Sequence, residues 1–162
     1  MRRWDKPGIP HKGWVLEGIE DIKADCIGDR SFEYEICEMC QHERIRYVHI
    51  LSHPNYDRVL RVGCDCACRM TEDYDTPFEL ERRAKNRANR RRNFLKQEWN
   101  LNSKGNYVLR YKGYNITAIQ RNGSWGFCYN GNWVWKYGDK RIYDFDILKL
   151  AAFEEFDDDK YR

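Results

Sequence analysis

Two cysteine clusters, Cys37-Glu-Met-Cys40 and Cys64-Asp-Cys66-Ala-Cys68, decide how the first half of this chain folds. They contain five of its seven cysteines and are separated only by residues 41–63. Thiolates paired at such short spacing suit a tetrahedral zinc ion, because each cluster can supply two sulfur ligands from one turn. The sequence therefore predicts a zinc-binding module.

Cys37 and Cys40 form the first predicted pair of ligands, and Cys64 with Cys66 forms the second. Cys68 is the alternative to Cys66 if a helix begins at Cys64, because residues four apart return to the same helix face. A third candidate for the last position is His42. Four thiolates would fill the zinc coordination sphere and leave no open position for water or substrate. We therefore expect a structural zinc ion and no catalytic residues.

The residues between the two clusters predict a hairpin. Residues 45–51 are rich in branched and aromatic side chains and indicate a strand, Ser52–Asp57 indicates a turn, and residues 59–62 indicate the returning strand. A cysteine turn, a hairpin, a second cysteine turn and a helix is the order of a zinc ribbon or treble clef. Residues 1–30 contain several turn formers and predict an irregular arm.

The most basic part of the chain follows, with a local charge balance of +7 over residues 81–96 in a chain whose net charge is +3. Thr76-Pro77 is a helix start signal, and we expect residues 71–100 to be largely helical. Arg83, Arg87, Arg90 and Arg91 should share one face of this helix. Like charges at that spacing disfavour a helix, so an anionic partner would help to explain them.

The last third predicts a small antiparallel sheet and a helix. Strand-like runs cover residues 107–111, 114–120, 125–129 and 133–137, and Asn122-Gly123 and Asn130-Gly131 are hairpin signals. A final helix capped by Asp144 should bury an apolar face against the sheet. The strands also carry three tryptophans that we expect to stack on nucleic-acid bases from an exposed face of the sheet. They are Trp125, Trp133 and Trp135.

Together these patterns predict an α+β protein in three segments. Residues 1–75 form the arm and zinc module, residues 76–102 the basic linking helix, and residues 103–162 an antiparallel meander packed with a C-terminal helix. Aromatic residues make up 15% of the chain, which argues against a disordered protein. There is no apolar run long enough to span a bilayer and no signal-peptide segment, so we expect a cytoplasmic protein with reduced cysteines and no membrane partner.

The chain also resembles a family of small uncharacterised zinc-ribbon-like proteins of bacteria and their phages. The similarity is carried by residues 10–14 (PHKGW), by Cys37-Glu-Met-Cys40, by His53-Pro54 and above all by Val62-Gly63-Cys64-Asp65-Cys66-Ala67. The last element is a further reason to choose Cys66 over Cys68. The resemblance implies a bacterial or phage protein in the bacterial, or host, cytoplasm, and it implies no activity.

A weaker similarity is to the GIY-YIG nucleases. Residues 47–51 (YVHIL) followed by Arg61-Val62-Gly63 look like the two core strands of that family. Its second tyrosine position is occupied here by Arg61 or Val62, and Cys64 follows the glycine. The similarity implies a metal-dependent nuclease as the least favoured hypothesis.

Two functions remain open from the sequence. The favoured hypothesis is a non-enzymatic nucleic-acid-binding protein that contacts DNA or RNA through Arg83, Arg87, Arg90, Arg91 and the three tryptophans. The alternative is a phage or bacterial adaptor or inhibitor, which would bind an acidic host protein through the same arginine and tryptophan side chains.

Overall fold

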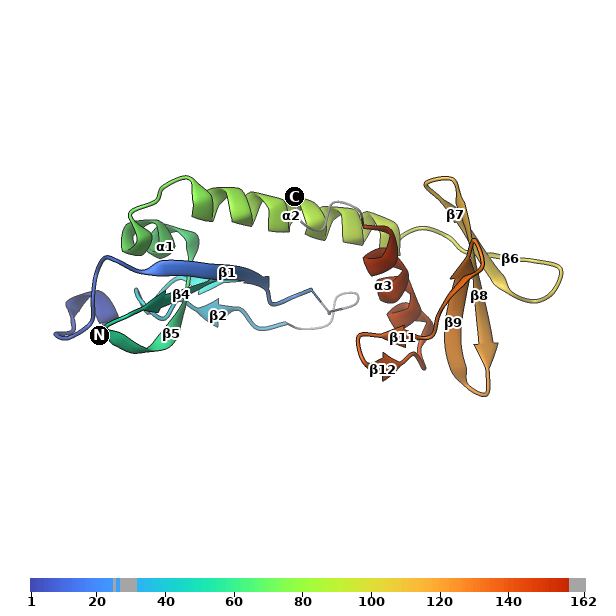
Figure 1. The fold of residues 1–162 in the computed structure, drawn as a ribbon, viewed down its shortest axis with the longest axis horizontal. Coiled ribbons are helices and arrows are strands. Elements are labelled where there is room, and N and C mark those ends of the chain that lie inside the picture. The colour runs from blue at the N-terminus through green and yellow to red at the C-terminus, as the bar shows by residue number, and fades with distance from the viewer. Residues whose placement is uncertain (25, 27–31, 158–162) are drawn as a thin grey trace. The chain divides into compact units, whose positions relative to one another are not determined.

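The computed structural model describes residues 1–24, 26 and 32–157 (Figure 1). Within them the fold is mixed α and β, with three α-helices and several small antiparallel sheets, which confirms the predicted α+β class. The chain divides into two compact units, Met1–Ala88 and Asn89–Arg162. The boundary therefore falls inside the long basic helix, whereas the sequence suggested boundaries on either side of it.

The first unit is built on a three-stranded antiparallel sheet in the order β1-β4-β5. These strands are β1 (Val15–Asp21), β4 (Tyr47–His53) and β5 (Tyr56–Val62). The hairpin β4–β5 is the one predicted between the cysteine clusters. Its register places His49 opposite Val62, which brings the end of β5 and the cysteines after it back beside the middle of β4.

Strand β1 corrects the expectation of an irregular arm over residues 1–30. Val15–Asp21 pairs with most of β4, from Val15 opposite Ser52 to Asp21 opposite Tyr47. The pairing register shifts between Leu16 and Gly18. The apolar and polar residues therefore do not alternate with the period of two by which a strand is recognised in a sequence. Residues 25 and 27–30 of the expected arm lie outside the described residues.

Two short strands and a helix complete the cysteine-bearing part of this unit. β2 (Glu35–Ile36) pairs with β3 (Arg44–Ile45), and the first cysteine turn lies between them. The helix α1 (Cys64–Thr71) begins directly at the second cysteine cluster and packs against β4 (Figure 1). Their buried side chains form one apolar core around Met39, Leu51 and Met70.

The basic segment forms a helix, α2 (Thr76–Leu95), which begins at the predicted residue and ends five residues earlier than the predicted limit of residue 100. Residues 72–75 of the range expected to be helical are not helical, because α1 ends at Thr71 and Glu72 follows in the left-handed conformation at φ 57°. At the start of α2, Asp73 accepts hydrogen bonds from the backbone N–H groups of Asp75 and Thr76. These bonds satisfy donors that a helix start leaves free.

The second unit is a five-stranded antiparallel sheet in the order β10-β9-β8-β7-β6. Its strands are β6 (Asn100–Leu101), β7 (Tyr107–Tyr111), β8 (Tyr114–Arg121), β9 (Ser124–Tyr129) and β10 (Asn132–Val134). The predicted hairpins are present, with Asn122 and Gly123 both at positive φ, as a two-residue turn of this kind requires.

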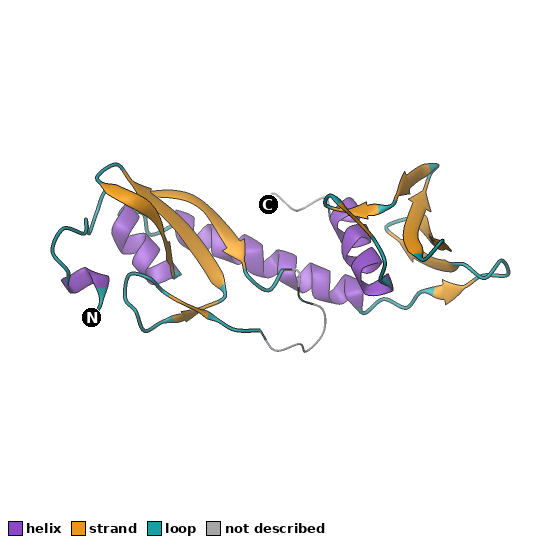
Figure 2. Ribbon diagram, turned by 90° about the horizontal axis from the view of Figure 1, so that it is seen from below, coloured by secondary structure: helices purple, strands orange, loops and turns teal. Residues whose placement is uncertain are grey.

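The predicted strand over residues 133–137 is split in the structure. β10 ends at Val134, and β11 (Lys136–Tyr137) turns away to pair with β12 (Lys140–Arg141). The helix α3 (Phe145–Phe156) packs against β9 and β11, as the purple helix among the strands of this unit in Figure 2. Its apolar face, with Phe127 and Ile116 from the sheet, makes the second core.

In the described part of the chain, no helix has both the length and the apolar character needed to cross a bilayer.

Candidate metal centre and candidate nucleic-acid interface

Three buried cysteines meet in the first unit. The Sγ atoms of Cys37, Cys40 and Cys66 all lie within 4.8 Å of one another. Sulfur ligands of one tetrahedral zinc ion are about 3.8 Å apart, as follows from a Zn–S bond of about 2.3 Å. The three thiols are therefore close enough to hold a metal ion. Among the described residues, no histidine or carboxylate completes this set.

The first two cysteines are positioned by a tight turn that is anchored on β5. The backbone N–H of Gln41 donates to the carbonyl of Cys37 at 2.9 Å, and Gln41 has φ 66°. Between the cysteines, Glu38 receives the backbone N–H of Arg61 at 3.2 Å through its carboxylate and donates its own N–H to the Arg61 carbonyl at 2.9 Å. This double contact fixes the turn against the strand that leads to Cys66.

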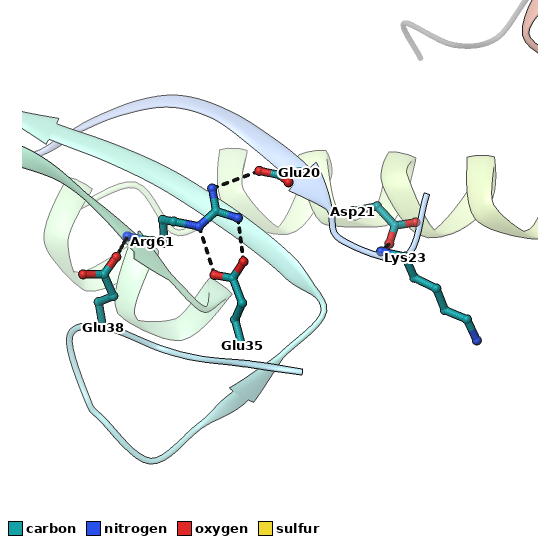
Figure 3. Close-up of polar contacts among 6 residues, drawn as sticks. All are labelled: Glu20, Asp21, Lys23, Glu35, Glu38 and Arg61. Carbon is teal, nitrogen blue, oxygen red and sulfur yellow. Dashed lines mark hydrogen bonds and ion pairs between the residues drawn. The ribbon is translucent and has the colours of Figure 1, made fainter. Parts of the chain in front are cut away.

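A charged network supports the same anchor (Figure 3). The guanidinium of Arg61 binds the carboxylate of Glu35 through two hydrogen bonds of 2.9 and 2.8 Å, and it reaches Glu20 at 2.9 Å. The pairing raises the pKa of Arg61 and holds the pKa of Glu35 below its usual range. Arg61 thus ties β1, β2 and β5 together around the cysteine turn.

The surroundings of Cys37 favour negative charge on its sulfur. Gly63 donates its backbone N–H to Cys37 Sγ at 3.4 Å. The hydrogen bond from Cys66, followed by those from nearby backbone groups, lowers the pKa of Cys37 to about 5. The same pairing raises the pKa of Cys66, since only one thiol of a close pair ionises readily. A metal ion would accept both as thiolates.

Trp4 adds a second polar group beside the sulfurs. Its indole N–H is buried without a hydrogen-bond partner of ordinary geometry among the described residues, and it partly opposes the rise in the pKa of Cys66. The short 3-10 helix Arg3–Asp5 that carries Trp4 is held on the cysteine turn, where the N–H of Arg3 donates to the Met39 carbonyl at 2.9 Å. A buried donor beside sulfur fits an anionic thiolate group.

Cys64 was predicted as a ligand and lies outside the group of three. α1 begins at Cys64, and residues two apart on a helix point about 200° apart. Cys64 therefore faces away from Cys66 and contacts Cys68 instead. Burial, followed by the charge of Glu81, raises the pKa of Cys64 to about 12. Of the predicted second pair, the structure brings only Cys66 to the first pair, and the alternative Cys68 stays with Cys64.

The histidines near the clusters have other contacts. The Nδ1 atom of His42 lies 3.1 Å from the Cys40 carbonyl, and His49 Nε2 lies 3.1 Å from the Pro77 carbonyl. His53 contacts the Lys12 carbonyl at 3.0 Å. Glu43 is the acidic neighbour of the site: its carboxylate would lie 2.5 Å from a β-carbon built on Gly63, and burial followed by the charge of Cys37 raises its pKa.

The predicted basic face of α2 is largely engaged with acidic groups or buried. Arg83 donates to Glu79 at 3.1 Å, and Arg90 binds the buried carboxylate of Asp157 at 2.9 Å. Arg91 is only 7% exposed. Arg87 is half-buried. An amphipathic pattern cannot predict all of these carboxylate partners, because Asp157 is distant in sequence.

Of the three predicted tryptophans, Trp125 is half-buried and packs against the second core, whereas Trp133 and Trp135 stack on each other. The ring of Trp125 packs on Phe145 of α3 with a centroid distance of 5.1 Å. Trp133 is 45% exposed and Trp135 is half-buried, and their rings are stacked, with centroids 5.5 Å apart and planes inclined by 10°. Arg121 lies 5.8 and 5.9 Å from the two ring centres.

A cationic pocket of about 390 Å³ adjoins this tryptophan pair. The residues that line it are Arg121, Asn122, Ser124, Trp135, Lys136, Arg141 and Tyr143. We call these residues together with Trp133 the tryptophan–arginine surface. Sequence reasoning missed its three cations and Tyr143, although aromatic and basic residues are interspersed between Trp133 and Tyr143, which is a signal of nucleic-acid binding.

None of the family models matches the chain, and neither a curated protein nor a solved structure matches it.

Proposed function

We propose that this protein is a non-enzymatic nucleic-acid-binding protein that contacts DNA or RNA through the tryptophan–arginine surface of its second unit. One observation carries the proposal. Arg121, Lys136 and Arg141 converge on one pocket beside two stacked tryptophans, and no carboxylate of the described residues lines that pocket. Cations without acidic partners, next to flat aromatic rings, suit a ligand that offers both phosphates and bases.

The contrast with the other arginines supports this choice of surface. Arg61, Arg83 and Arg90 each bind a carboxylate at about hydrogen-bond distance, so their charge is largely neutralised within the protein. Within the part of the chain that the structure describes, no carboxylate pairs with the three pocket cations. A phosphate group that approaches them gains charge-assisted hydrogen bonds and breaks no ion pair.

The pairing of β11 with β12 adds a second reason. Lys136 and Arg141 are direct cross-strand partners in this hairpin. Like charges in opposed positions of an antiparallel pair destabilise it. A bound phosphate between these two side chains would remove the repulsion, so the same geometry that costs stability in the free protein favours an anionic ligand.

We further propose that Cys37, Cys40 and Cys66 bind a structural zinc ion in a zinc-ribbon or treble-clef-like module. The thiols lie in the apolar core of the first unit, around Met39 and Met70, and not in a cleft. Zinc is a preferred metal for sets of thiolate ligands, and the free energy of zinc binding helps small modules to fold. Three sulfurs leave one coordination position for a further ligand. Among the described residues, Glu43 is an acidic neighbour of Cys37, and the predicted Cys64 would reach the site only if α1 unwound at its first residue.

The test of nucleic-acid binding is a titration of labelled DNA and RNA, single- and double-stranded, with the full-length protein at low salt. We expect retention of at least one form, and an affinity that falls steeply as salt rises. The Arg121→Gln/Arg141→Gln double variant should bind weakly. Lys104→Gln is the matched control, because Lys104 is an exposed cation of the same unit that does not line the pocket.

If none of the four forms is retained at low salt, the proposal is wrong. The adaptor hypothesis then predicts that the same double variant, and not Lys104→Gln, abolishes binding to an acidic protein partner. A nuclease would instead cleave one of the four substrates in a reaction that requires a divalent metal.

A further inference from the structure

We infer that the tryptophan–arginine surface selects single-stranded nucleic acid, holding one unpaired base on Trp133 and the adjoining phosphate in the pocket of Arg121, Lys136 and Arg141. This inference deepens the proposed function and rests on it. It names which form of nucleic acid the surface takes.

The stacked rings of Trp133 and Trp135 are already held in position in the free protein. A β-carbon built on Gly126 would lie 2.4 to 2.7 Å from the indole atoms of Trp135, so this ring lies directly on the backbone of β9. Trp133 is stacked with Trp135 and lies on the edge strand β10, where 45% of its surface is open to solvent. A base can therefore stack on Trp133 without rearrangement of the protein.

The three cations of the pocket are positioned to contact the nucleic-acid phosphate that adjoins the stacked base. Arg121 is near both indole rings, at 5.8 and 5.9 Å from their centres, and it also lines the pocket. Lys136 and Arg141 line the same pocket from the β11–β12 hairpin. Tyr143, which is 68% exposed, borders it as a further aromatic side chain. Trp135 also lines the pocket, so the stacked tryptophan pair and the proposed phosphate site adjoin each other.

A duplex does not satisfy this arrangement. Its bases are covered on both faces by their neighbours, and taking one out of the stack costs free energy. In a single strand the bases are already free to stack on an aromatic ring. A pocket of about 390 Å³ is also within the size range of small-ligand sites, so it takes a nucleotide unit more readily than the convex backbone of a helix.

The experiment measures the affinity of the full-length protein for an oligonucleotide of about eight nucleotides and for its duplex with the complementary strand. We expect the single strand to bind at least about tenfold more tightly. Trp133→Ala should weaken single-strand binding by about 5- to 150-fold, the range of one lost stacking contact. Trp133→Phe should recover part of that loss, because phenylalanine keeps an aromatic face.

The two proposals fail in different ways. Equal affinity for single strand and duplex, or an unchanged single-strand affinity in Trp133→Ala, overturns the single-strand inference and leaves nucleic-acid binding intact. Absence of binding to either form at low salt removes the proposed function itself. Circular dichroism of each variant establishes that it is folded, and Trp133→Phe provides the measurement if Trp133→Ala does not fold.

Discussion

The indole ring of Trp135 rests on the backbone of Gly126, with no room between them for a side chain. A β-carbon on Gly126 would approach Trp135 Cε3 to 2.4 Å, closer than real β-carbons come to any heavy atom. Gly126 is buried in the middle of β9, so the strand cannot give way easily. The glycine therefore fixes where Trp135 lies, and through it where the stacked ring of Trp133 lies.

Gly126→Ala should displace Trp135 and disturb the proposed binding surface. We expect a loss of about 1–3 kcal/mol in the free energy of unfolding, as for other overpacked sites, and a weaker affinity for nucleic acid. Thermal unfolding and oligonucleotide titration measure the two effects. Gly18→Ala is the control, because Gly18 has no heavy atom within 4 Å of its built β-carbon and no left-handed backbone. Unchanged affinity in Gly126→Ala would show that the position of Trp135 is irrelevant to binding.

Cys66→Ser should lose the metal, whereas Cys64→Ser should keep it. Cys66 is close to both Cys37 and Cys40, while Cys64 lies on the other side of α1. We expect about one zinc per chain in the unaltered protein and in Cys64→Ser, and much less in Cys66→Ser. Elemental analysis gives the stoichiometry, and the charge-transfer bands of the Co²⁺ form report the number of thiolate ligands.

The opposite result for Cys64 has a clear meaning. If Cys64→Ser binds no zinc, or its Co²⁺ form has fewer thiolate ligands, then Cys64 is the fourth ligand that the sequence predicts and α1 must unwind at its first residue. In that event Glu43→Gln should have no effect on metal affinity. A loss of about tenfold or more in Glu43→Gln would instead assign the acidic side chain to the metal or to its surroundings.

The contrast between these two cysteines indicates what the sequence could predict. The clusters, the hairpin between them and the helix after them follow from spacing and turn chemistry. The first residue of that helix does not, because a start one or two residues earlier or later is equally compatible with the pattern. That boundary alone decides whether Cys64 or Cys66 faces Cys37, since a shift of one residue turns a helical side chain by about 100°.

The sequence indicates less well which aromatic and basic side chains are available at the surface than which cysteines meet, and for a different reason. Trp125, Trp133 and Trp135 all look alike in a strand pattern, yet Trp125 packs on Phe145 against the second core, which only the tertiary structure reveals. The arginines of α2 likewise look free in sequence, because the carboxylate that binds Arg90 belongs to the distant Asp157. Local patterns predicted the elements; contacts between distant residues decided which side chains remain available.

Arg61→Gln should destabilise the first unit, and the loss should depend on pH. The guanidinium binds Glu35 and Glu20, and these partly exposed pairs contribute about 1 kcal/mol together once solvent screening is considered. Because the pKa of Glu35 is lowered by Arg61, this stabilisation is fully present above the ordinary carboxyl pKa and is lost as the pH falls through the lowered value.

The measurement is urea unfolding of the unaltered protein and of Arg61→Gln between about pH 7 and pH 3, the range that includes the ordinary glutamate pKa. The difference in unfolding free energy should shrink toward acid pH. Arg61→Lys is the matched control, since it keeps the charge and loses the forked contact with Glu35. A difference that is constant over this pH range would contradict the role of the ion pair.

Asp144→Ala should weaken the second unit by about 1 kcal/mol, the usual effect of removing an N-cap. The Asp144 carboxylate accepts a hydrogen bond of 2.7 Å from the backbone N–H of Asp146 at the start of α3. Asp144→Asn keeps an oxygen acceptor and should retain most of the stability. Thermal unfolding followed by circular dichroism compares the three proteins, and equal midpoints for Asp144→Ala and the unaltered protein would contradict the cap.

Substitution of two different pairs of arginines distinguishes binding at the tryptophan–arginine surface from binding at the basic helix α2. Arg82 and Arg83 share the carboxylate of Glu79, whereas Arg121 and Arg141 line a pocket that is without a carboxylate among the described residues. Each double substitution by glutamine removes two positive charges, so a purely non-specific attraction of the protein for polyanions would weaken equally in both. If phosphates contact the pocket cations directly, the two double variants should instead be weakened unequally.

The slope of log affinity against log salt should decrease in magnitude by about two in Arg121→Gln/Arg141→Gln and stay nearly unchanged in Arg82→Gln/Arg83→Gln. The reverse pattern would move the interface to α2 and restore the basic helix that the sequence predicts as the contact surface.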